Sequence, residues 1–217
     1  MIPHTELVER IKQYDPDADG DAITRAYEFS KHAHREQKRS SGEPYFSHPL
    51  EVATILADMR LDSASIMTAL LHDTVEDTEA TEQQLREQFG DEIAHLVEGV
   101  TKLSQIKLNS DQSKQAENFR KLVLAMSEDI RVLLVKLADR LHNMQTIGHI
   151  PREEKRKRIA RETLDLYAPL AERIGIAKMK EQLEDLSFAQ LVPEARESIL
   201  ARLDFLRSEG SNLVDSI

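Results

Sequence analysis

The sequence predicts an all-α protein, and three observations carry this prediction. Apolar residues recur about every three to four positions along most of the chain, as they do on one face of an amphipathic helix. Glycine and proline each occur only 7 times, too seldom for the many turns of a β-sandwich or barrel. Hydrophobic residues make up 40% of the 217 residues and charged residues 31%, which is typical of a globular chain and excludes a disordered one.

Composition also excludes several classes of function. The chain has no cysteine, so disulfides, thiolate catalysis and cysteine zinc sites are excluded, and histidine and carboxylates remain as the strong metal ligands. Residues 1–6 lack the pattern of a signal peptide, and no apolar run approaches a bilayer span. We therefore expect a cytoplasmic protein without membrane contact. The net charge of -10 argues against nucleic-acid binding but leaves room for a local basic pocket for an anionic small molecule.

Two helices are expected before the first long loop. Residues 5–14 carry Leu7 and Ile11 on one face, and Asp21 can cap a second helix over residues 22–37. The acidic turn between these helices lacks the bidentate glutamate spacing of a calcium loop, so it is interpreted as a solvated turn.

The loop over residues 39–49 is dense in turn-forming residues. Pro49 suits the first position of a helix, which places His48 at the N-cap. Arg39, Ser40 and Ser41 precede it and suit phosphate binding, whereas His48 as a simple capping residue is the alternative.

The stretch over residues 70–78 is the most informative, because an apolar run ends there in four groups that bind metal or move protons. Ser63 can cap the helix that carries it. In a continuous helix His72 stacks over Glu76, and Asp73 over Asp77, since residues four apart share a face. Three carboxylates and an imidazole in two turns repel one another and lose hydration, and a divalent cation would offset this cost. The stretch therefore predicts the core of a metal hydrolase.

Further helices follow. Thr81 and Gln84 form a capping-box pattern for a helix that ends at Gly90, and another helix begins at Asp91. Residues 107–114 are polar and aperiodic and are expected to form a loop, for which a lid and plain disorder remain alternatives. Residues 118–127 resume a helical pattern.

A long helix over residues 130–144 is expected to be nearly all buried and to be capped by Asp129. In this helix Asp139 and Asn143 share a face, with Lys136 and Arg140 on a neighbouring one. The alternative is that Asp139 only pairs with one of those two cations.

The last part of the chain continues in helices. The basic helix over residues 152–167 offers either a solvated, paired face or a site for phosphates or an acidic partner. Pro169 interrupts the pattern, and helices over 178–191 and 194–208 follow a break at Gly175. The chain stops within an apolar pattern, which suggests a piece of something longer.

The motifs resemble a known family. His48, His72-Asp73 and Asp139 reproduce the ordered H…HD…D signature of HD phosphohydrolases. Residues 39–45, 72–78 and 136–144 are similar to the hydrolase domain of RelA/SpoT homologues, and residues 161–171 and 181–188 are similar to the helices that lead towards the synthetase of long members. The resemblance runs from about residue 22 to residue 191.

The resemblance implies the helical fold of HD-domain phosphohydrolases with additional C-terminal helices. The implied domains are an N-terminal helix and loop over 1–20, a hydrolase domain over 21–168 and a helical linker over 169–217. That linker would run towards an absent synthetase, and the regulatory domains of the longer chain would be absent as well.

The resemblance also implies a reaction and its residues. Guanosine tetra- and pentaphosphate would lose the 3′-pyrophosphate, with one Mn²⁺ held by His48, His72, Asp73 and Asp139, and with Glu76 and Asp77 activating the water. The implied substrate contacts are Arg39, Ser40, Ser41, Arg140, Asn143 and Thr146. Two alternatives remain: an HD phosphohydrolase for another nucleotide, and a regulatory module that binds a partner through the 152–161 face.

Overall fold

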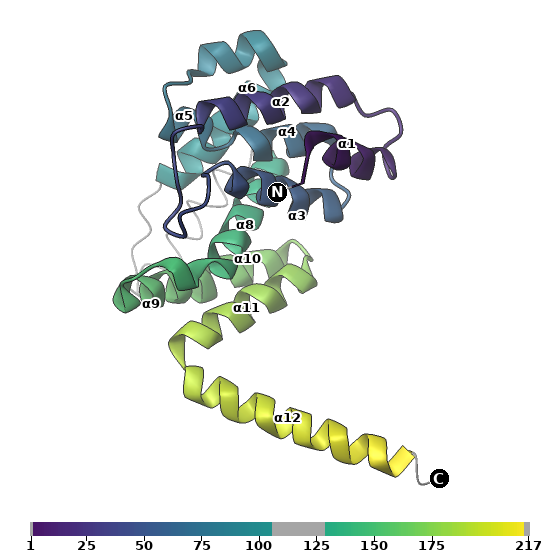
Figure 1. Ribbon diagram of the computed structural model, residues 1–217, viewed down its shortest axis with the longest axis vertical. Helices are drawn as coiled ribbons and strands as arrows, with labels where there is room; N and C mark the ends of the chain where they lie inside the picture. Colours follow the sequence, from purple (N-terminus) through teal and green to yellow (C-terminus); the bar gives the residue numbers. More distant parts are fainter. Residues whose placement is uncertain (1, 106–128, 215–217) are drawn as a thin grey trace. The chain divides into compact units, whose positions relative to one another are not determined.

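The computed structural model describes residues 2–105 and 129–214, which form two compact units, residues 1–149 and residues 150–217 (Figure 1). Within the described ranges every regular element is a helix, and the only β pairing there is an isolated bridge between Lys38 and Pro44. The all-α prediction is therefore confirmed. No helix in the described part of the chain is long and apolar enough to cross a membrane. The expected loop over 107–114 and helix over 118–127 lie outside the described residues.

The first unit is a bundle in which α3, α4 and α8 form the centre. Helix α3 packs against both α4 and α8, while α2 packs on α4, and α6 packs on α4 and α8 (Figure 1). The helices of this unit are α1 (His4–Lys12), α2 (Gly20–Ala33), α3 (Ser47–Asp58), α4 (Ser63–Leu71), α5 (Thr74–Asp77), α6 (Glu82–Gln105), α8 (Ile130–Gln145) and the short η2 (Ile147–His149).

Helix α2 is shorter than expected. Asp19, not Asp21, caps it by accepting from the amide of Ala22 at 2.9 Å. The helix ends at Ala33 instead of residue 37, because residues 34–37 form turns. In these turns His34 Nδ1 lies 2.8 Å from Gln37 Oε1, and Gln37 Nε2 donates to the carbonyl of Asp77 at 2.5 Å.

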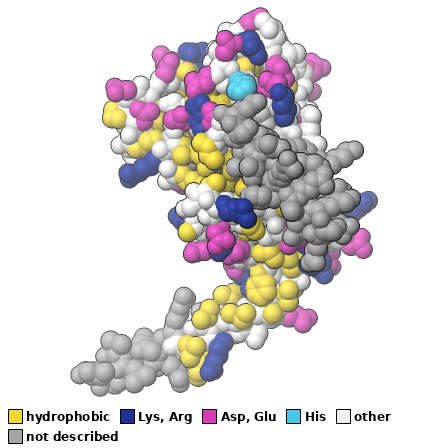
Figure 2. Space-filling model, turned by 180° about the vertical axis from the view of Figure 1, so that it is seen from behind, with side chains coloured by type: hydrophobic (Ala, Val, Ile, Leu, Met, Phe, Trp, Pro, Cys, Tyr) yellow, Lys and Arg dark blue, Asp and Glu magenta, His cyan; other side chains and the backbone are white. Residues whose placement is uncertain are grey.

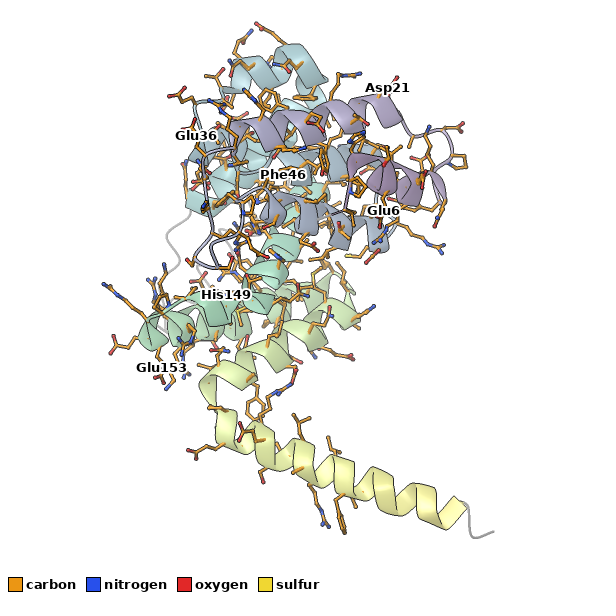
Figure 3. All side chains as sticks on the ribbon, viewed as in Figure 1. Glu6, Asp21, Glu36, Phe46, His149 and Glu153 are labelled. Atoms are coloured by element: carbon orange, nitrogen blue, oxygen red, sulfur yellow. The ribbon has the colours of Figure 1, made fainter. Side chains whose placement is uncertain are left out.

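Helix α3 begins earlier than expected, so His48 lies inside its first turn and not at the N-cap. The turn before the helix continues into it, since the amide of His48 donates to the carbonyl of Tyr45 and the amide of Leu50 to that of Phe46. Phe46, labelled in Figure 3, is buried at this start and meets the ring of Tyr27 edge-on at 4.8 Å. The buried ring anchors the N-terminal end of α3 in the core.

The expected continuous helix through the central stretch is interrupted. Asp62, not Ser63, caps α4, and α4 ends at Leu71, so His72 and Asp73 form a turn before α5. Two side chains occupy carbonyls at this end: His72 Nδ1 lies 2.8 Å from the oxygen of Ala69, and Thr74 Oγ1 donates to the oxygen of Leu71. Competition of this kind weakens the helical hydrogen-bond ladder and allows the chain to turn.

Helix α6 confirms the predicted capping box and the predicted break. Thr81 and Gln84 bond reciprocally, the amide of Gln84 to Thr81 Oγ1 at 3.3 Å and the amide of Thr81 to Gln84 Oε1 at 3.0 Å. Gly90 has φ 88° and ψ 171°, a conformation that side chains rarely adopt, and it joins two helical halves.

Gly99→Ala is expected to destabilise the first unit, because an added Cβ would lie 2.8 Å from Val132 Cγ2, where α6 meets α8. Overpacking costs about 1–3 kcal/mol, and the better helix propensity of alanine returns at most about 1 kcal/mol. Urea unfolding measures the difference. Gly148→Ala is the control, since a Cβ there meets nothing within 4 Å. Equal stability of the two variants would contradict the packing argument.

The second unit is a helical array of α9 (Glu153–Glu162), a π-helical turn η3 (Thr163–Tyr167), α10 (Ala168–Arg173), α11 (Ala177–Leu191) and α12 (Pro193–Val214). Pro169 was expected to interrupt the helix, but the chain stays helical there. A wider π turn precedes Pro169, and it accommodates the amide hydrogen bond that proline cannot form. Gly175, with φ 83°, separates α10 from α11 as predicted. Apolar side chains are exposed on α12 (Figure 2), among them Ile199, Leu203 and Phe205.

Candidate metal centre

Three buried side chains from distant parts of the sequence converge in the first unit. His48 comes from the first turn of α3, His72 from the turn between α4 and α5, and Asp139 from the middle of α8. Each offers one ligand atom, and these atoms all lie within 4.8 Å of one another. These residues are 3%, 2% and 4% exposed, so water does not hydrate their polar groups.

Asp73 brings a fourth donor to the same place. Its Oδ1 lies 3.0 Å from His72 Nε2 and its Oδ2 lies 3.6 Å from His48 Nε2. His48 Nε2 is also 3.2 Å from Asp139 Oδ1. The break after α4 makes this possible, because adjacent residues in a continuous helix point about 100° apart. The sequence-predicted set of four donors is therefore brought together, although by a turn and not by a helix face.

The position of the hydrogen on His72 shows whether this residue can bind a cation. Its Nδ1 faces the carbonyl of Ala69 at 2.8 Å and must carry the hydrogen, because a carbonyl only accepts. In the neutral ring Nε2 then carries the lone pair; this atom is fully buried and has no hydrogen bond of acceptable geometry, although Asp73 Oδ1 is 3.0 Å away. Lone pairs directed at carboxylates fit a divalent cation between them.

The charges around the cluster favour a positive charge at this point. Burial opposes a charge on His72, but Asp73 and Asp139 outweigh it and raise the pKa of His72 to about 9, so the ring binds a proton at Nε2 that a divalent cation would displace. Burial likewise opposes ionisation of Asp73, yet His72 keeps the pKa of Asp73 below its ordinary value. For Asp139 the opposing cation is Lys136, which holds the pKa of Asp139 well below its ordinary value. The site thus keeps two ionised carboxylates, which attract a cation.

Polar side chains of α8 hold Asp139 in place. Lys136 Nζ donates to Asp139 Oδ2 at 2.6 Å, and Asn143 Nδ2 donates to Asp139 Oδ1 at 2.5 Å. The expected shared face of Asp139 and Asn143 is confirmed. The pairing of Asp139 with Lys136, which the sequence left as an alternative, is present, because residues three apart also meet on a helix. Lys136 additionally donates to Ser104 Oγ at 3.0 Å, which fixes its ammonium group.

Glu76 and Asp77 are exposed on α5, next to the buried donors. Burial, followed by the charges of Asp73 and Asp77, raises the pKa of Glu76. The hydroxyl of Tyr45 lies 2.8 Å from Asp77 Oδ2 and 2.9 Å from Asp73 Oδ2, so it ties the two carboxylates together. Asp77 also lines an open pocket of about 590 Å³.

The residues predicted to contact substrate fall into two groups. Arg39 is half-buried and reaches the cluster: its Nη2 donates to Asn143 Oδ1 at 3.1 Å and its Nη1 lies 3.3 Å from His142 Nδ1. The hydroxyl of Thr146 donates to the carbonyl of His142 at 3.0 Å, at the C-terminal end of α8. Ser40 and Ser41 are in the turn in which the amide of Gly42 donates to the carbonyl of Arg39, and Arg140 is half-buried on α8.

Two contacts to the cluster were missed by the sequence reasoning, those of Tyr45 and His142. His142 Nδ1 lies 2.7 Å from His48 Nδ1, and the two rings stack with centroids 5.0 Å apart. Burial, helped by His48 and Arg39, lowers the pKa of His142 to about 3. The helical spacing of three between Asp139 and His142 was a usable signal. No signal of this kind exists for Tyr45, whose contacts are 28 and 32 residues away.

The chain is similar to several known proteins. A family model described as an HD domain matches residues 26–177. The GTP pyrophosphokinase rsh of Brucella melitensis is 55% identical over 217 residues, which are 100% of this chain and 29% of that protein. The bifunctional (p)ppGpp synthase/hydrolase SpoT of Escherichia coli is 47% identical over 217 residues, 100% of this chain and 31% of that protein.

Two further matches are named for one reaction. The guanosine-3′,5′-bis(diphosphate) 3′-pyrophosphohydrolase of Haemophilus influenzae is 51% identical over 188 residues, 87% of this chain and 28% of that protein. A solved structure, described as a metazoan ortholog of SpoT that hydrolyzes ppGpp, has a TM-score of 0.58 and 28% identity, covering 79% of this chain and 97% of that one. The chain thus spans less than a third of the length of each of these three curated relatives.

Proposed function

The chain belongs to the HD-domain family of the Rel/SpoT type, and from this premise we propose that it is a manganese-dependent hydrolase that removes the 3′-pyrophosphate of guanosine tetra- and pentaphosphate. The observation that carries the proposal is the convergence of ring nitrogens of His48 and His72 with the carboxylates of Asp73 and Asp139. Mixed imidazole and carboxylate donors support Mn²⁺ as the cation. The names of the relatives supply the substrate.

The proposed roles follow from where the groups lie. When bound, a divalent cation lowers the pKa of a water molecule and polarises a phosphoryl group. Glu76 or Asp77 takes the proton of the attacking water, since both are carboxylates at the edge of the cluster. Hydroxide then attacks the phosphorus on the ribose 3′ oxygen, the bond between them breaks, and the 3′ oxygen takes up a proton. The products are pyrophosphate and GDP, or GTP from the pentaphosphate.

Arg39, Ser40, Ser41, Arg140, Asn143 and Thr146 are proposed as the substrate contacts. Arg39 is the strongest of them, because its guanidinium presents paired donors that suit phosphate oxygens and already lies within reach of Asn143. The hydroxyl of Tyr45 holds the carboxylate of Asp77, one of the two proposed bases, beside the carboxylate of Asp73.

The experiment that tests the proposal measures pyrophosphate release from guanosine tetraphosphate by the purified chain. Release with Mn²⁺ and none with EDTA is expected. Preferential turnover of GDP, GTP or ATP would indicate another nucleotide hydrolase, and metal binding without any release would indicate a regulatory module. Either result overturns the proposed reaction.

Arg39→Ala is expected to raise KM for guanosine tetraphosphate more than it lowers kcat. A charge-assisted hydrogen bond contributes about 1.5–3 kcal/mol, which corresponds to about a 10–150-fold rise in KM. Steady-state kinetics at saturating Mn²⁺ measure it. Arg35→Ala, an exposed arginine at the end of the same turn region, is the matched control. An unchanged KM in Arg39→Ala would remove Arg39 from the substrate site.

A further inference from the structure

His142 has no part in the proposed chemistry, yet it contacts both His48, a proposed cation ligand, and Arg39, a proposed substrate contact. It is 8% exposed on α8. Its Nδ1 lies 2.7 Å from Nδ1 of His48 and 3.3 Å from Nη1 of Arg39, and the rings of the two histidines lie 28° from parallel. One ring nitrogen of His142 therefore meets two side chains that lie 94 and 103 residues away from it in the sequence.

The contact with Arg39 decides which nitrogen carries the hydrogen. A guanidinium only donates hydrogen bonds, so Nδ1 of His142 is the acceptor of this pair. Because Nδ1 of His142 accepts, the hydrogen in the 2.7 Å contact belongs to Nδ1 of His48. In the opposite tautomer of His48, two lone pairs would face each other at that distance.

The assignment has a direct consequence for Nε2 of His48. In the neutral ring that can bind a cation, the hydrogen on Nδ1 leaves the lone pair on Nε2, and this atom lies 3.2 Å from Asp139 Oδ1 and 3.6 Å from Asp73 Oδ2. His72 reaches the same state through a backbone carbonyl, that of Ala69. The hydrogen-bond acceptor for Nδ1 of His48 is the side chain of His142, whereas that for His72 is a backbone carbonyl. A substitution at residue 142 can therefore remove the partner that orients His48.

We propose that His142 is a positioning residue that fixes His48 in the Nδ1–H tautomer and so presents Nε2 to the cation. The inference deepens the proposed function and rests on it for the identity of the site. Partners of this kind set the tautomer and ring orientation of a metal ligand, and their loss typically weakens metal affinity by about 10–100-fold.

The test compares two substitutions that differ in hydrogen-bonding capacity. His142→Phe keeps a flat ring against His48 but removes the acceptor, whereas His142→Asn keeps an oxygen acceptor close to the position of Nδ1. Isothermal titration calorimetry with MnCl₂ as the titrant measures the Kd of each. We expect the Kd of His142→Phe to rise about 10–100-fold and that of His142→Asn to stay within about threefold of the parent. Added Mn²⁺ should then restore kcat in His142→Phe, because only affinity is lost.

Controls separate this role from a purely structural one. His149→Phe makes the same change at an exposed histidine (Figure 3) and should bind Mn²⁺ like the parent. Parent-like affinity in His142→Phe, or equal weakening in His142→Phe and His142→Asn, would overturn the proposal. If His142→Phe does not fold, His142→Leu replaces it with the same expectation. Should the parent bind Mn²⁺ but release no pyrophosphate, the proposed reaction fails while the Kd values still decide the role of His142.

Discussion

Asp139→Asn is expected to abolish Mn²⁺ binding and, with it, pyrophosphate release. The substitution keeps the shape of the side chain and one oxygen that accepts hydrogen bonds, but it removes the buried negative charge of Asp139 and leaves Asp73 as the remaining carboxylate of the cluster. Because Asp139 is a proposed ligand and not an outer partner, the loss of affinity should exceed the roughly 10–100-fold effect of outer partners. Titration calorimetry with MnCl₂ and the pyrophosphate assay measure the two losses.

Thermal unfolding gives an independent measure of the same effect. A ligand at 100 times its Kd stabilises the folded state by about 2.7 kcal/mol, which raises the Tm of a protein of this size by about 5–11 °C. The parent should show this rise with Mn²⁺ and Asp139→Asn should not. Asp17→Asn, in the exposed turn before α2, is the matched control. A full Mn²⁺-dependent rise in Asp139→Asn would exclude Asp139 as a ligand.

Glu76→Gln and Asp77→Asn are expected to lower kcat while leaving Mn²⁺ affinity unchanged. Loss of a general base typically costs about 10²–10⁴-fold, and the more severe variant identifies the residue that takes the proton. Single-turnover pyrophosphate release at saturating Mn²⁺ measures this, with Glu79→Gln as an exposed control nearby. Loss of Mn²⁺ binding in Glu76→Gln would instead make Glu76 a ligand, and unchanged kcat in both variants would exclude both as the base.

The raised pKa of Glu76 predicts how kcat depends on pH. Burial raises this pKa first, and the charges of Asp73 and Asp77 raise it further. A base with a raised pKa becomes protonated at a higher pH, so kcat should fall as the pH drops through that value. Asp77→Asn removes one of the negative neighbours and should move the acid limb of the pH profile to lower pH. A shift to higher pH, or none with Glu76 still required, would contradict this assignment.

Much of the fold could be read from local patterns. Asp129 accepts from the amide of Arg131 at 2.8 Å, as its predicted capping role requires, and the Thr81 capping box lies where the sequence placed it. These features depend on residues two to four positions apart, and such contacts follow from helical geometry. The shared face of Asp139 and Asn143 was predictable for the same reason.

The parts of the site that the sequence did not reveal depend on contacts between distant residues. The contact between His48 and His142 spans 94 residues, and that between Arg39 and Asn143 spans 104. No periodicity reports such pairs. The end of α4 was missed for another reason, because side-chain competition for the carbonyls of Ala69 and Leu71 overrides the helical pattern.

From the turn between α4 and α5 to the end of α5, the geometry of the site depends more on the number of residues than on which residues they are. Each residue of a helix rotates the next by about 100° and advances it by about 1.5 Å. One residue inserted between Asp73 and Asp77 would leave His72 and Asp73 in register with the core yet swing the carboxylate of Asp77 away from Tyr45. Substitutions in this segment thus change the properties of single side chains, whereas one inserted or deleted residue would move the carboxylate of Asp77 away from the buried donors.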